Sequence, residues 1–134
     1  MPPRTRTRTV GRGHFRVVYD EGPLVRKQGY PPNIEHGTAC NKAEALFWTQ
    51  IRDTPDAIWF APVVEVAPDY SWILQVKCGP YQGQDKTEAL RVCERLGVWN
   101  VNSPANYGTL AGRLVVVDMA ANPLLPWGPT DPVT

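Results

Sequence analysis

The stretch Arg113-Leu114-Val115-Val116-Val117-Asp118, preceded by Asn106-Tyr107-Gly108, decides the fold. Its four consecutive apolar residues, three of them β-branched, predict a buried strand that delivers a carboxylate to its C-terminal end. Such a strand, with an asparagine presented nearby, is one way in which α/β and α+β proteins hold a metal–phosphate group. The alternative is a core strand whose final Asp118 caps the next turn. Both interpretations stay open on this stretch alone.

Composition limits the class of protein. The 134 residues, 43% of them hydrophobic, suffice for one domain with a real core, and the net charge of +1 gives no overall attraction to nucleic acid or an anionic membrane. No apolar run approaches the roughly 18 to 20 residues of a membrane helix, and the basic N-terminus lacks the hydrophobic segment of a secretory signal. Three cysteines without a C-x-x-C pair favour reduced thiols in a cytoplasm. His14 and His36 lack partners at metal-ligand spacing, so we predict no zinc site.

Both ends of the chain are expected to lie outside a domain that spans residues 10–121. Residues 1–9 alternate arginine with threonine, which predicts a flexible basic arm or an edge strand. Residues 122–134 carry several prolines and no periodicity, which predicts an extended tail. Leu124, Leu125 and Trp127 are unusual in a free tail, and they would pack either on the domain or against a partner.

Between these ends the pattern predicts an α+β domain. A helix is expected to begin at Asn41, because Glu44 follows at the spacing of a capping box and residues 28–40 read as a loop. A second helix is expected to end at Gly97, a favourable residue after a helix C-terminus. The predicted strands and helices cover residues 15–19, 24–27, 41–51, 59–66, 71–77, 85–96 and 113–117.

This order resembles the N-terminal lobe of protein kinases. The stretch Gly11-Arg12-Gly13-His14-Phe15-Arg16-Val17-Val18 is similar to the glycine-rich loop G-x-G-x-x-G-x-V, and Leu24-Val25-Arg26-Lys27 to V-A-I-K, which carries the phosphate-binding lysine. Glu44 lies on the following helix, where kinases keep the carboxylate partner of that lysine. Asn106 matches the catalytic-loop asparagine, and Asp118-Met119-Ala120 matches D-F-G.

Two longer patterns narrow the resemblance to small kinase-like proteins of phages and their hosts. They are N-x-x-E-x-x-x-W, beginning at Asn41, and N-x-G-x-x-x-G-R-L-V-V-x-D, beginning at Asn106. The implied fold is a kinase N-lobe-like antiparallel sheet with one packed helix. A truncated C-lobe remnant would follow, with the helix over 85–96 and a catalytic-loop-like strand.

The resemblance implies a nucleotide–magnesium site, with ATP and Mg²⁺ as the possible cofactors. Asn106 and Asp118 would share the metal. The residues that would form the site are Gly11, Gly13, Lys27, Glu44, Asn106 and Asp118. Each of the last four also has a structural alternative: an ordinary ion pair between Lys27 and Glu44, a loop brace at Asn106 and a cap at Asp118.

The departures from the kinase pattern argue against catalysis. Val101 stands at the position of the catalytic aspartate and cannot accept a proton, which removes roughly 10²- to 10⁴-fold of rate enhancement from phosphoryl transfer. Trp99 replaces the histidine of H-R-D, Arg16 the third loop glycine, and Ala120 the glycine of D-F-G. No activation segment or A-P-E motif follows. We therefore predict no kinase activity.

The function expected from the sequence is a non-catalytic protein-interaction module, encoded by a phage and acting in the host cytoplasm. It would bind or inhibit a host or defence protein, or serve in assembly. The alternative is a nucleotide–Mg-binding pseudokinase or weak phosphotransferase, and self-association is also open. Neither nucleic acid nor membrane is an expected partner. The predicted contact residues are Arg4, Arg6, Arg8, Trp59, Tyr70, Trp72, Leu125 and Trp127.

Overall fold

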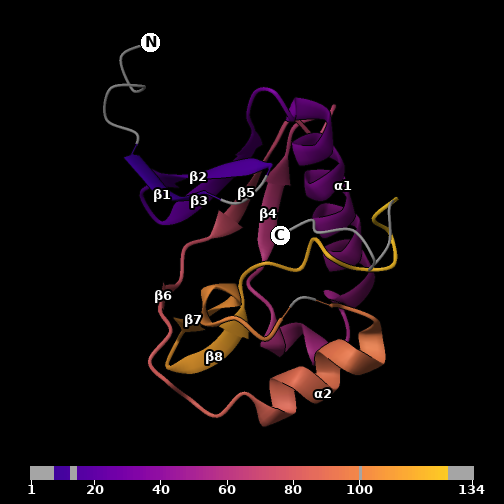
Figure 1. The fold of residues 1–134 in the computed structure, drawn as a ribbon. Helices are drawn as coiled ribbons and strands as arrows, with labels where there is room; N and C mark the ends of the chain where they lie inside the picture. The colour runs from indigo at the N-terminus through magenta and orange to yellow at the C-terminus, as the bar shows by residue number, and fades with distance from the viewer. Residues whose placement is uncertain (1–7, 13–14, 100, 127–134) are drawn as a thin grey trace.

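The chain folds into an α+β structure with two antiparallel sheets, and the computed structural model describes residues 8–12, 15–99 and 101–126 (Figure 1). The larger sheet has the order β1-β2-β3-β5-β4, and the smaller one the order β6-β7-β8. The strands are β1 (Arg8–Arg12), β2 (Arg16–Glu21), β3 (Leu24–Gly29), β4 (Val63–Val66), β5 (Trp72–Val76), β6 (Gly79–Pro80), β7 (Tyr107–Leu110) and β8 (Arg113–Val116). The helices are α1 (Ile34–Ile51) and α2 (Thr87–Leu96), with 3₁₀ turns η2 (Pro55–Trp59) and η3 (Pro104–Asn106).

The hairpin of β2 and β3 sets the direction of the side chains that matter for the candidate site. A tight turn at Gly22, whose φ is 78°, joins the two strands. The register places Arg16 opposite Gly29 and Val18 opposite Lys27. Because directly opposed residues share a face and alternate residues return to it, Arg16 and Lys27 project from the same face of the sheet.

Helix α1 begins at Ile34, so the predicted start at Asn41 and its capping box are wrong. Asn41 and Glu44 lie inside the helix, and both are 0% exposed. The first turns contain Gly37, where helix and strand meet backbone to backbone: a Cβ at Gly37 would lie 2.4 Å from Cα of Gly29. This close packing outweighs the low helix propensity that made residues 28–40 read as a loop.

Helix α2 and the β7–β8 hairpin frame the second part of the molecule. The helix begins at Thr87, whose backbone N–H donates to Oδ1 of Asp85, and Gly97 ends it at a φ of 81°, as expected. Strand β8 confirms the predicted strand, while β7 was not predicted. Ala111 and Gly112, both at positive φ, form the two-residue turn between them.

One large core cluster joins α1, α2 and the smaller sheet. In Figure 1, α2 lies at the end of the molecule away from β1–β3, and β7 and β8 lie between it and the larger sheet. The buried members of the cluster are Phe47, Ile51, Phe60, Ala89, Val92, Cys93, Val98, Val101, Tyr107, Leu114, Val116 and Met119. The two parts of the chain are therefore packed as one body.

Residues after β8 pack back on α1. Leu125 is 4% exposed and lies in a second cluster with Cys40, Ala43 and Ala120, and Asn122 is 0% exposed. The described part of the predicted tail, residues 122–126, thus belongs to the folded domain. Among the helices described, none is long and apolar enough to cross a bilayer.

Candidate functional site

A buried cluster of charged side chains lies where β2, β3, α1 and the segment after β8 meet. Glu44 of α1 is at its centre. Nζ of Lys27 donates to both carboxylate oxygens of Glu44, at 2.9 and 3.1 Å, and to the carbonyl of Val117 at 2.6 Å. Lys27 is 5% exposed. The implied ion pair between Lys27 and Glu44 is therefore formed, and it also ties β3 to the end of β8.

Arg16 enters the same cluster from β2. Its Nη1 donates to Oε1 of Glu44 at 2.8 Å and to Oδ1 of Asn41 at 3.1 Å. Its Nη2 donates to Oδ1 of Asp118 at 3.2 Å. The planar guanidinium thus bridges two carboxylates that come from distant parts of the chain, a geometry that suits arginine better than lysine.

The Glu44 carboxylate is fully engaged inside the protein. Besides Lys27 and Arg16, it accepts the backbone N–H of Met119 at 2.7 Å. Burial by itself raises the pKa of Glu44, but the two cations and this N–H outweigh it and lower the pKa to about 2. For Arg16, burial opposes the charged form, whereas Glu44 and Asp118 raise its pKa above the ordinary value. Both groups are held in their charged forms.

Glu44 is expected to stay ionised in the folded protein well below its ordinary pKa of 4.5. Because the folded-state pKa is lowered, its contribution to stability is complete above pH 4.5 and is lost as the pH falls from there toward about 2. Carbon-13 NMR of the Glu44 carboxyl should show no titration between pH 5 and 3. A Glu44 carboxyl that titrates near its ordinary pKa of 4.5 would contradict the described cluster.

Two asparagines hold the helix in place around this cluster. Nδ2 of Asn41 donates to the carbonyl of Tyr70 at 2.9 Å, in the turn between β4 and β5. Nδ2 of Asn122 donates to the carbonyls of Ala43 and Met119, at 3.1 and 2.6 Å. These bonds fix α1 against the larger sheet and against the chain that leaves β8.

Asp118 is the one carboxylate of the cluster that reaches solvent, with 27% of its side chain exposed. Its Oδ1 accepts from Arg16 and from the backbone N–H of Ala120 at 3.2 Å, so the capping role is present. A magnesium ion on this oxygen would lie beside the Arg16 guanidinium and repel it. Among the described residues, no group of three or more His, Cys, Asp or Glu could hold a metal. Oδ1 of Asp118 is therefore engaged by Arg16 and by the Ala120 N–H, an unfavourable setting for a divalent cation on that oxygen.

The sequence resemblance assigns Asn106 and Val101 to the catalytic-loop positions. The backbone N–H of Asn106 donates to Ser103 and its carbonyl accepts from Val117, at 3.0 and 2.8 Å, so this residue braces the loop against the end of β8. Val101 is 7% exposed and belongs to the large core cluster. Val101 is therefore part of the apolar core.

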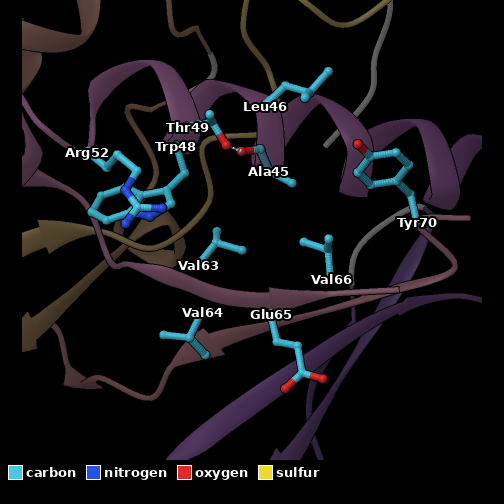
Figure 2. Close-up of a pocket in the computed structure, with 10 residues that line it drawn as sticks. All are labelled: Ala45, Leu46, Trp48, Thr49, Arg52, Val63, Val64, Glu65, Val66 and Tyr70. Carbon is cyan, nitrogen blue, oxygen red and sulfur yellow. Dashed lines mark hydrogen bonds between the residues drawn. The ribbon is translucent and has the colours of Figure 1, made fainter. Parts of the chain in front are cut away.

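A groove between α1 and β4 is the second feature of interest (Figure 2). Val63 and Val66 point toward the helix in Figure 2, whereas Val64 and Glu65 point away. Adjacent strand residues normally point to opposite faces, and a register shift between Val63 and Glu65 explains why Val64 and Glu65 both point away from the helix. The groove is lined by Ala45, Leu46, Trp48, Thr49, Arg52, Val63, Val64, Glu65, Val66 and Tyr70.

The predicted contact residues are scattered rather than gathered in one surface. Trp59, Tyr70 and Trp72 are half-buried, and Tyr70 lines the groove. Leu125, a predicted partner contact, is 4% exposed and packs with Cys40, Ala43 and Ala120 of its own domain, so its side chain is not presented at the surface. Gly11 lies in β1 opposite Val18. The backbone of Arg8, in β1, pairs with that of Asp20 in β2. The other predicted residues, Arg4, Arg6, Gly13 and Trp127, lie outside the described part of the chain.

Sequence reasoning missed the part that Arg16 plays, treating it as a mere departure from a glycine. A signal was present: the two-residue turn between β2 and β3 sets the register, and that register puts Arg16 on the face of Lys27. Asn41, expected at a helix start, makes a buried contact instead. Asn122, expected in a tail, is buried against α1. The last two depend on contacts that no local pattern indicates.

Comparison with known proteins supports the fold alone. No family model matches the chain, and no curated protein does. Among solved structures, the co-crystal structure of WbdD and the kinase inhibitor LY294002 is similar, with a TM-score of 0.56 and 16% sequence identity. The similarity covers 87% of this chain and 33% of that one, so the chain spans about a third of that protein's length.

Proposed function

We propose that this protein is a non-catalytic interaction module on a kinase-like scaffold with a truncated second lobe. The carrying observation is the bridge from Arg16 to Glu44 and Asp118, at 2.8 and 3.2 Å. It engages within the chain both the carboxylate that a kinase pairs with its lysine and the carboxylate that a kinase directs at metal. Valine at position 101 agrees with this, because it cannot act as a general base. A phage-encoded protein that binds or inhibits a host or defence protein in the cytoplasm, or takes part in assembly, fits such a scaffold.

The groove beside β4 is the contact surface that we favour. Val64 and Val66 are 50% and 38% exposed, and Ile58 nearby in sequence is 53% exposed. β4 is also the outer strand of the larger sheet, so one side of its backbone pairs with no other described strand. Apolar side chains on an open sheet edge commonly mark a surface that another protein covers. Arg52 and Glu65 at the groove would add polar contacts at its rim.

The double substitution Val64→Asp and Val66→Asp is expected to reduce partner capture from host lysate about tenfold or more, because two charges would be buried at the contact. The measurement is affinity capture after crosslinking, with quantitative mass spectrometry against the unmodified protein. Ile34→Asp is the matched control, since Ile34 is 49% exposed at the start of α1, away from this groove. Equal loss in the control, or no loss in the double variant, would argue against this surface.

Nucleotide binding is the second candidate. It is favoured by the Lys27–Glu44 ion pair at 2.9 Å and by the partial exposure of Asp118, whose side chain is 27% exposed. A rise in the melting temperature of the unmodified protein with magnesium-ATP, lost in Asp118→Asn, would select this candidate over a ligand-free scaffold.

A further inference from the structure

The charged cluster is balanced without any bound ion. Arg16 and Lys27 carry two positive charges, and Glu44 and Asp118 carry two negative charges. Three of the four side chains are nearly or fully buried, with Arg16 at 8%, Lys27 at 5% and Glu44 at 0% exposure. A site arranged for magnesium normally presents an excess of negative oxygen ligands. Here the excess is absent because one more cation, Arg16, has been added to the lysine and the two carboxylates.

The Arg16 guanidinium is held in place by three hydrogen bonds. Its Nη1 is shared by Glu44 and Asn41, and its Nη2 reaches Asp118, so the guanidinium is held on two sides by three acceptors. These acceptors come from α1 and from the segment after β8, whereas Arg16 itself belongs to β2. The guanidinium therefore links β2 to α1 and to the segment after β8 through their carboxylates, as a bridging metal ion links separate elements in other proteins.

We propose that Arg16 is the resident cation of this site, that it takes the place of a divalent metal and excludes magnesium nucleotide, and that removing it creates a magnesium-nucleotide site. In the absence of the guanidinium, the negative charge of Asp118 is no longer paired with a cation and is available to Mg²⁺. Lys27 keeps its bonds to Glu44 and to the carbonyl of Val117. The probe for the opened site is ATP with Mg²⁺, the ligand that the sequence resemblance implies.

The test is a set of thermal melts of the full chain with no addition, with ATP in EDTA and with ATP plus Mg²⁺. The variants are Arg16→Gly, Arg16→Gln and Arg16→Gly combined with Asp118→Asn. The unmodified protein is expected to show no shift. Arg16→Gly should rise by several degrees with ATP plus Mg²⁺ but not with ATP in EDTA, and the added Asp118→Asn should abolish the rise. Arg16→Gln removes the charge while keeping a hydrogen-bonding amide, so it serves if the glycine variant does not fold.

A second measurement needs no variant. Mn²⁺ added to the unmodified protein should leave the amide NMR signals of Asp118 to Ala120 unbroadened, because the metal is excluded. Broadening there, or a magnesium-dependent shift of the unmodified protein, would overturn the proposal. So would a folded Arg16 variant that stays as unresponsive as the unmodified protein, or one that responds equally in EDTA. Partner capture through the β4 groove is measured in a separate experiment. A negative result there would argue against the proposed interaction surface and would leave the test of Arg16 unaffected.

Discussion

Replacing Glu44 by alanine is expected to lower the free energy of unfolding by about 3 to 5 kcal/mol, the usual cost of removing one partner from a buried ion pair. Glu44 is 0% exposed and accepts hydrogen bonds from Lys27, Arg16 and the backbone of Met119. Its loss would leave two buried cations facing each other with Asp118 as their remaining carboxylate in the cluster. Urea unfolding followed by circular dichroism measures the change.

The matched control for this variant is Glu88→Ala. Glu88 also pairs with an arginine, Arg91 at 3.3 Å, but both side chains are exposed, at 58% and 71%. Exposed pairs of this kind contribute about 0 to 1 kcal/mol, so the control should unfold nearly as the unmodified protein does. A similar decrease in the free energy of unfolding in both variants would mean that Glu44 is not buried among cations, and would contradict the described charged cluster.

Replacing Gly37 by alanine is expected to destabilise the protein by about 3 kcal/mol, the upper range for inserting a methyl group into a packed contact. Helix propensity alone predicts the opposite, a gain of up to about 1 kcal/mol. The structure reverses the sign because the new Cβ would lie 2.4 Å from Cα of Gly29 and 2.6 Å from the carbonyl oxygen of Phe15. Both neighbours are backbone atoms, so α1 would have to move away from β3.

The control for Gly37 is Gln50→Ala, an exposed position of the same helix. There propensity acts alone, and the free energy of unfolding should change by a few tenths of a kcal/mol at most. The pair of variants thus separates intrinsic helix preference from packing. A Gly37→Ala protein as stable as Gln50→Ala would show that helix and strand do not meet backbone to backbone.

The elements that could be predicted from sequence are those specified by neighbouring residues. The run that precedes Asp118 forms β8 because consecutive β-branched residues suit a buried strand. Gly97 ends α2 at a φ of 81°, a conformation that glycine adopts without strain. The two-residue turn at Gly22 determines the register of β2 and β3. In each case the deciding chemistry lies within a few residues.

The kinase-like pairing of Lys27 with Glu44 was implied by resemblance, and the structure forms it. The same resemblance implies that Asp118 shares a metal; in the structure its Oδ1 accepts a hydrogen bond from Arg16, 102 residues away along the chain. Sequence separation of that kind leaves no local signal. Whether an arginine reaches a carboxylate depends on where the sheet, the helix and the chain after β8 are brought together.

By itself, then, the sequence determined the class of the fold, the hairpin and the strand that ends in Asp118. Tertiary structure decided where α1 begins, because the contact of Gly37 with Gly29 stabilises turns that propensity disfavours. It also buried Leu125 and placed Arg16 between two carboxylates. The physical reason is common to all three: the stabilising partner is distant in sequence, and only the folded chain brings it within contact distance.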